Sequence, residues 1–172
     1  MAQTLTLRPD AAGDETSING QYPASDYHWD KVDEETPDEA ETTVYTSSTT
    51  YLRDLYNLPA SSGSETINKI TVYFRTKVEN TYCKSKASIK SDSTVTDGAE
   101  KTNAGTANWE NHSQECALNP ADGAAWAWAD IDALQIGVSL IGISTGDRKN
   151  SCTQVYIEVD YTLKNPLPIF LK

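Results

Sequence analysis

The chain has 172 residues and a mass of 18.9 kDa, with 38% hydrophobic and 23% charged residues. Asp and Glu outnumber Lys and Arg by 25 to 14, so the formal net charge is -11. Such an acidic chain lacks the basic surface that neutralises phosphates, which argues against nucleic-acid partners and against anionic membranes. The sequence holds no run of 18 apolar residues, which excludes a transmembrane helix.

Alternation of apolar and polar residues predicts strands along most of the chain. About eight stretches show it: 4–8, 42–46, 50–56, 67–79, 85–90, 109–116, 134–141 and 151–163. In 67–79 the core-facing set is Ile70, Val72, Phe74, Thr76 and Val78, whereas Tyr73 and Arg75 belong to the polar face. In 151–163 the core-facing set is Val155, Ile157, Val159, Tyr161 and Leu163, and Tyr156 belongs to the polar face.

One short helix is expected at about 127–134, where Asp130 and Asp132 favour the positive end of the helix dipole. No helix alternates regularly with the strands, which argues against a parallel βαβ sheet. The pattern predicts an all-β protein: a two-sheet, jelly-roll-like β-sandwich with extended N- and C-terminal arms. We expect one domain over residues 1–163 and a separate apolar tail over residues 164–172.

Residues 9–41 are polar and show no periodicity, which predicts a long arm that wraps the sandwich or crosses to a neighbour. Within it, residues 26–41 hold eight acids and one base, a net charge of -7. Three interpretations stay open: a solvated loop, a docking site for a basic partner, or a weak calcium site. The calcium candidates are Asp30, Asp33 and Asp38, with Glu34 and Glu39 beside them.

The tail 164–172 is apolar and contains two prolines. Exposed apolar side chains of this kind are sticky, so the tail either folds back on its own domain or contacts another subunit. Its candidate assembly residues are Leu167, Ile169, Phe170 and Leu171.

The sequence shows no catalytic or metal-binding motif. Cys83, Cys116 and Cys152 lack zinc-site spacing, and whether two of them pair stays open. The histidines, His28 and His112, belong to no recognisable catalytic set. We therefore expect no enzymatic activity and no cofactor.

Trp126 and Trp128 flank Ala127 just before the expected helix. Exposed tryptophans can stack on sugars, so the pair is a possible glycan platform. The alternative is that both rings pack at the end of the sandwich core.

Five segments of the sequence, taken together, are similar to those of a known kind of domain: 28–39, 53–59, 67–75, 128–140 and 152–162. Together they resemble a β-sandwich domain of uncharacterised structural proteins of tailed phages and prophages. The resemblance implies a virion component, most simply a capsid decoration or cement protein. Its partners would be the major capsid protein or copies of itself in a homo-oligomer. It assigns no catalytic residue and no ligand.

The N-terminus has neither the basic nor the apolar region of a secretion signal, so we expect virion localisation with release by host lysis. The alternative function is a carbohydrate-binding jelly-roll module that uses Trp126, Trp128 and surface tyrosines. The two functions differ in class, because one is assembly and the other is ligand recognition.

Overall fold

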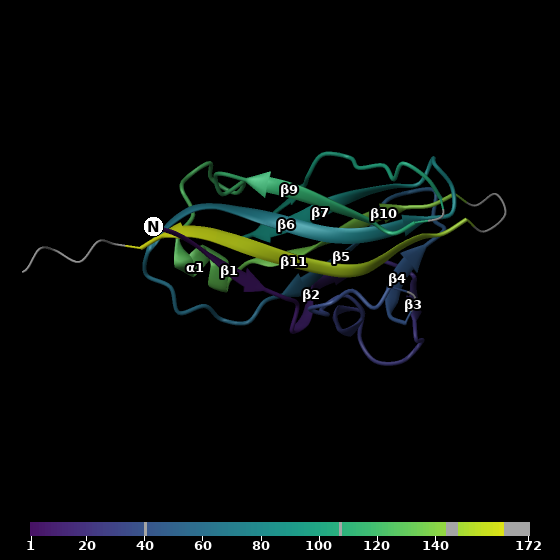
Figure 1. Cartoon of the computed structure of the whole chain (residues 1–172), viewed down its shortest axis with the longest axis horizontal. Helices are drawn as coiled ribbons and strands as arrows, with labels where there is room; N and C mark the ends of the chain where they lie inside the picture. Colours follow the sequence, from purple (N-terminus) through teal and green to yellow (C-terminus); the bar gives the residue numbers. More distant parts are fainter. Residues whose placement is uncertain (40, 107, 144–147, 164–172) are drawn as a thin grey trace, which may run out of the picture.

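The computed structural model describes residues 1–39, 41–106, 108–143 and 148–163, and these form two antiparallel sheets (Figure 1). The six-stranded sheet contains β1 (Ala2–Leu7), β3 (Gly20–Tyr22), β4 (Thr43–Thr46), β6 (Thr66–Val78), β9 (Glu110–Cys116) and β11 (Asn150–Thr162). The five-stranded sheet contains β2 (Ala11–Thr16), β5 (Leu52–Asn57), β7 (Lys84–Ser91), β8 (Thr94–Asp97) and β10 (Gln135–Ile141). The helical segments are η1 (Trp29–Lys31) and α1 (Trp128–Asp132), and no helix among the described residues is long and apolar enough to cross a membrane.

The long strand β11 organises the six-stranded sheet, whose order is β3-β4-β11-β6-β9. One edge of β11 pairs with β6 along its whole length, and the two strands run side by side in Figure 1. The other edge pairs first with β4 and then with β1. Between these two partners the Val155 N–H donates to the Val32 carbonyl at 2.7 Å. The chain that follows η1 therefore fills the gap in the sheet edge.

The second sheet has the order β2-β5-β10-β7-β8. From β4 to β7 consecutive strands alternate between the two sheets, so each connection crosses the end of the sandwich. This topology confirms the all-β, two-sheet sandwich expected from the strand pattern.

The alternation in the sequence reports correctly which side chains face the core. The predicted inward residues of β6 are at most 1% exposed, as are Val155, Ile157 and Val159 of β11. Tyr161 and Leu163 differ from the prediction, since Tyr161 is half-buried and Leu163 is exposed. Tyr161 is the penultimate residue of β11, where Trp128 of α1 packs edge-on against its ring, and Leu163 follows the strand.

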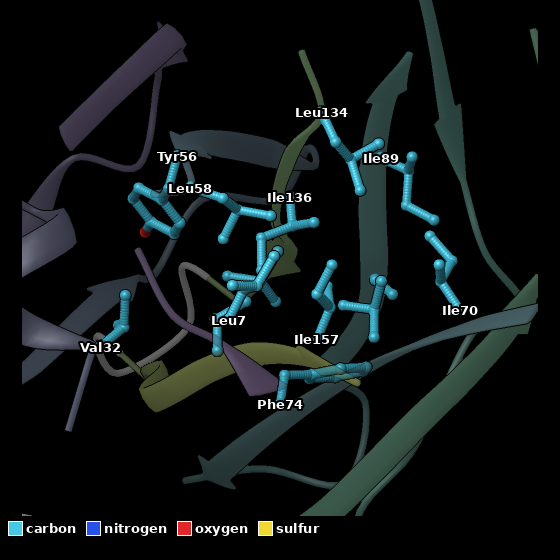
Figure 2. Packing of buried hydrophobic residues seen from close by; sticks show 14 of the residues in the cluster. Leu7, Val32, Tyr56, Leu58, Ile70, Phe74, Ile89, Leu134, Ile136 and Ile157 are labelled. Carbon is cyan, nitrogen blue, oxygen red and sulfur yellow. The ribbon is translucent and has the colours of Figure 1, made fainter. Parts of the chain in front are cut away.

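The core lies between the sheets, where side chains from both point toward one another (Figure 2). Phe74 and Ile157 come from the six-stranded sheet, and Ile136 and Leu140 come from the five-stranded one. Burial of each such side chain stabilises the fold by about 1.5–3 kcal/mol.

The prediction of a long arm over residues 9–41 is wrong. This segment supplies β2 to one sheet and β3 to the other, and it buries Ile18 and Val32 in the core. Together with β8, these strands raise the count from the expected eight to eleven. All three are short edge or near-edge strands that bury few side chains, so their local pattern is weak. The tail 164–172 lies outside the described residues.

The expected helix forms as α1, shorter than predicted. The Asp130 carboxylate accepts the Ala127 N–H at 2.8 Å and so caps the first turn. Asp132 instead accepts the backbone N–H and the hydroxyl of Ser61, each at 2.7 Å. These two hydrogen bonds tie α1 to the β5–β6 connection and lower the pKa of Asp132.

Candidate functional site

The outer face of the six-stranded sheet is hollowed by a cavity of about 430 Å³. Because alternate residues of each strand face the core, the residues between them are delivered to this surface. The cavity is lined by side chains from four strands and by one loop wall: Thr6, Arg8, Glu35, Pro37, Tyr73, Phe74, Arg75, Asn111, His112, Gln154, Tyr156 and Glu158. The site is therefore built from residues far apart in the sequence.

A row of stacked side chains crosses the middle of this face. The β11–β6 register places Tyr156 opposite Tyr73. Their rings stack with centroids 4.9 Å apart and planes 12° from parallel. The guanidinium carbon of Arg8 lies 4.9 Å from the Tyr156 centroid, on a side chain that directly follows β1. On the other side of Tyr73 the register places the short Ser113. We call Arg8, Tyr156 and Tyr73 the aromatic row.

The second row of this face is polar. Arg75 donates through Nη1 to Asn111 Oδ1 at 2.8 Å and through Nη2 to Glu39 Oε1 at 2.6 Å. Its Nε atom is buried without a hydrogen-bond partner, and so is Nη1 of Arg8. A buried donor left unpaired costs about 1–3 kcal/mol. Both unpaired donors are enclosed by protein atoms, so a bound acceptor reaches them only if the guanidinium group turns toward the cavity.

The tyrosine hydroxyls of the aromatic row stay protonated at neutral pH. Burial, and then the nearby Glu158 carboxylate, raise the pKa of both Tyr73 and Tyr156 above the usual phenol value. Both hydroxyls can therefore donate as well as accept hydrogen bonds. The cavity offers donors and acceptors in a mixed arrangement.

The acidic segment forms one wall of the cavity. Gln154 of β11 donates through Nε2 to the Glu34 carbonyl at 2.7 Å, which holds the segment against the sheet. The Thr153 hydroxyl donates to Asp38 at 3.2 Å. Burial raises the pKa of Asp33 and of Glu34. The interpretation as a freely solvated loop is therefore wrong for this stretch, because it is docked on β11.

The carboxylates proposed for calcium have separate partners. Asp30 pairs with Lys31 at 3.2 Å, whereas Asp38 accepts the Thr42 hydroxyl at 2.8 Å. Asp33 interacts electrostatically with Asp30 and Lys31, but no cluster of three or more His, Cys, Asp or Glu suited to a metal ion occurs in the part of the chain that the structure describes. The structure does not bring Asp30, Asp33 and Asp38 together as one site.

The three cysteines are free thiols. Cys83 and Cys152 are fully buried, and Cys116 is half-buried. Burial raises the pKa of Cys152 to about 12. The question of pairing is thus answered by their places in the fold, where each packs as a small apolar side chain.

Trp126 and Trp128 pack rather than form an open platform. Trp126 is 5% exposed, and its indole N–H donates to the Cys116 carbonyl at 3.0 Å. Trp128 is half-buried, donates to the Glu65 carbonyl at 2.8 Å and meets Tyr161 edge-on with centroids 5.5 Å apart. These contacts match the packing interpretation and leave both indole N–H groups occupied.

The two histidines occupy different environments. His28 Nδ1 lies 2.6 Å from Oδ2 of the fully buried Asp54. That pair orients the imidazole as in many hydrolases, but no described hydroxyl or thiol is hydrogen-bonded to Nε2. His112 lies 3.3 Å from Asn103 Oδ1, and burial lowers its pKa. Neither residue completes a catalytic set among the described residues.

Sequence reasoning missed the cavity, although it placed Tyr73, Arg75 and Tyr156 on polar faces. The sequence did contain one signal for the cavity, which is the presence of a tyrosine at a solvent-facing position in each of the two clearest strands. The pattern could not show that these two strands pair in the register that stacks the rings.

Comparison with known proteins carries no argument about this chain. No protein-family model and no curated protein matches the chain. Among solved structures, that of TmCBM61 in complex with β-1,4-galactotriose matches 70% of this chain and 72% of that chain. The sequence identity is 14% and the TM-score 0.42, values at which the likeness decides nothing about ligand or role.

Proposed function

We propose that this chain is a non-catalytic glycan-binding domain whose ligand lies in the cavity on the outer face of the six-stranded sheet. The observation that carries the proposal is the aromatic row in one cavity with the guanidinium groups of Arg8 and Arg75. Sugars present apolar C–H faces that pack on aromatic rings and hydroxyls that need both donors and acceptors. Because Tyr73 and Arg8 cover the two faces of Tyr156, a sugar would meet the outer face of Tyr73, beside Ser113, together with the polar groups of the cavity.

The balance of charge favours a neutral ligand. Arg8 and Arg75 face the carboxylates of Glu35 and Glu158 across the same cavity. An anionic ligand would meet the two carboxylates, and a cationic one would meet the two guanidinium groups. A neutral, hydroxyl-rich ligand can pair with all four groups.

A second hollow on the same face supports an extended ligand. It has a volume of about 280 Å³ and is lined by Tyr22, Thr43, Tyr45, Lys77, Glu79, Trp109, Lys149 and Ser151. Lys149 Nζ lies 4.4 Å from the Tyr45 centroid, which repeats the cation–aromatic contact of the first hollow. Tyr73 and Lys77 are four residues apart on β6, roughly 13 Å along the strand. We expect an oligosaccharide that spans both hollows to bind more tightly than a monosaccharide.

A glycan array followed by calorimetric titration tests the proposal. Tyr156→Ala removes the middle of the aromatic row and is expected to weaken binding by about tenfold or more, the effect of losing a stacking contact. The matched control is Tyr51→Ala. Tyr51 also carries a cation, Lys86 Nζ at 4.2 Å, but it precedes β5 in the other sheet. The control is expected to bind normally.

Trp126→Ala and Trp128→Ala separate the present proposal from the platform interpretation. Both should lower stability and leave the affinity of the folded protein unchanged. Binding to no glycan on the array, or binding that Tyr156→Ala leaves untouched, would contradict the proposal.

The virion role stays a prediction beside this proposal, because a virion subunit can carry a glycan-binding domain. Its contact residues, Leu167, Ile169, Phe170 and Leu171, lie outside the described part of the chain. Electron microscopy of particles with and without this protein checks it. Regular density on the head would support decoration, and unchanged particles without that density would contradict it.

A further inference from the structure

A smaller cavity of about 200 Å³ lies beside the η1 turn and shares no lining residue with the two hollows described above. Its walls are aromatic and its polar groups come from β2, β3 and the turn: Thr16, Gln21, Asp26, Tyr27, His28, Trp29 and Tyr56, with Ala12. The Tyr27 and Trp29 rings are stacked with centroids 6.2 Å apart and planes 14° from parallel. The cavity therefore combines ring faces with a few polar atoms.

The imidazole in this cavity has a defined orientation. The buried Asp54 carboxylate accepts the Ile18 N–H at 2.9 Å and the Tyr56 hydroxyl at 3.2 Å, so His28 Nδ1 is its third donor. His28 Nε2 is the ring nitrogen that faces away from Asp54.

Gln21 contributes an acceptor. Its Nε2 lies 3.3 Å from the carbonyls of Ser25 and of Asp26, so two acceptors fix the amide nitrogen on that side. The Oε1 atom is consequently turned away, and it is buried without a hydrogen-bond partner. A donor from a ligand that enters the cavity would give this oxygen a partner.

The charges around the cavity are negative in sum. Asp26 lines it, Asp54 lies behind His28, and Asp30 is two residues from His28. Lys31 pairs with Asp30 at 3.2 Å and lies 3.8 Å from Asp26. Three carboxylates outnumber Lys31 and His28 even when the imidazole is protonated. The surroundings thus favour a positively charged ligand.

We propose that this cavity binds an organic ammonium group, a ligand chemistry distinct from the neutral glycan of the sheet face. Aromatic faces attract an ammonium ion through their quadrupoles, and a carboxylate at the rim adds to the attraction. Gln21 Oε1 accepts N–H or polarised C–H donors. Nothing in this proposal depends on the glycan site.

Choline is a suitable probe, and 3,3-dimethylbutan-1-ol is its neutral isostere. In ¹H–¹⁵N spectra of the full chain, choline is expected to shift the Trp29 indole signal in a saturable way, whereas the isostere leaves it unchanged. Trp29→Phe assigns that signal. Equal shifts from both probes would reduce the site to an apolar pocket and overturn the proposal, and so would no shift from either.

Substitutions at Gln21 supply the second measurement. Gln21→Leu is expected to weaken choline binding by about two- to fivefold, because the N-methyl groups of choline donate only polarised C–H groups to Oε1, and Gln21→Glu is expected to strengthen binding. Gln114→Leu is the matched control, because Gln114 lies in β9 at the opposite edge of the same sheet from β3. Choline affinity that is the same in Gln21→Leu as in the control would refute the assignment. Tyr156→Ala should leave choline binding intact, so the two proposals fail independently.

Discussion

Gly137 lies in the middle of β10, where the backbones of two strands come closest. The register places it between Leu55 of β5 and Ser88 of β7. A Cβ added at this position would lie 1.8 Å from the Asp54 carbonyl oxygen and 2.8 Å from its carbonyl carbon. These are backbone atoms, so the contact cannot be relieved by rotating a side chain. Gly137→Ala must push β5 away from β10.

Overpacking of this kind costs at least about 1–3 kcal/mol. In a chain of this size each kcal/mol lowers the melting temperature by about 2–4 °C, so Gly137→Ala should lower it by roughly 2–12 °C. Gly105→Ala is the matched control, since a Cβ there meets nothing within 4 Å. That change should raise stability by about 0.4–1 kcal/mol, because it restricts the unfolded chain.

Differential scanning calorimetry of the two alanine variants measures this difference directly. Displacement of β5 should also affect the cavity beside η1, because the clash falls on Asp54, which orients His28. Choline binding should therefore weaken in Gly137→Ala and not in Gly105→Ala. Equal melting temperatures for the two variants would refute the inference that β5 and β10 approach this closely.

Three further predictions follow from the core, the second sheet and the cysteines. Ile157→Ala should cost about 2–5 kcal/mol in urea unfolding, and Leu118→Ala almost nothing, because Ile157 is fully buried and Leu118 is 54% exposed. Burial acts to raise the pKa of Asp97, but hydrogen bonds led by those from Arg53 at 2.9 and 3.1 Å outweigh it and hold that pKa below 3.8. A depressed carboxyl pKa contributes stability above the unfolded value, and this is lost as pH falls below about 4. Asp97→Ala should therefore cost about 1.5–3 kcal/mol at pH 7 and much less at pH 2, and an equal loss at both would contradict the ion pair. The buried Cys152 thiol, with its pKa of about 12, should resist a thiol-specific reagent at pH 8 until the protein unfolds, and rapid native labelling would count against its placement.

The sequence predicts which side chains of the candidate site face solvent, but not which of them come together. Alternation assigns Tyr73, Arg75 and Tyr156 to solvent-facing positions, because burial of every second side chain is a local property of each strand. It could not show that Tyr73 and Tyr156, 83 positions apart, stack on each other. Nor could it show that the acidic segment becomes a wall of the cavity. Those facts depend on which strand edges pair.

The sequence by itself determined the strands that bury a full face, the two-sheet architecture and the concentration of acid in residues 26–41. Each of these depends on residue types within one short window. Tertiary structure alone decided the edge strands β2, β3 and β8, the aromatic row and the contact of His28 with Asp54. The physical reason is that short edge strands and cross-strand contacts gain their free energy from distant partners, which no local periodicity records.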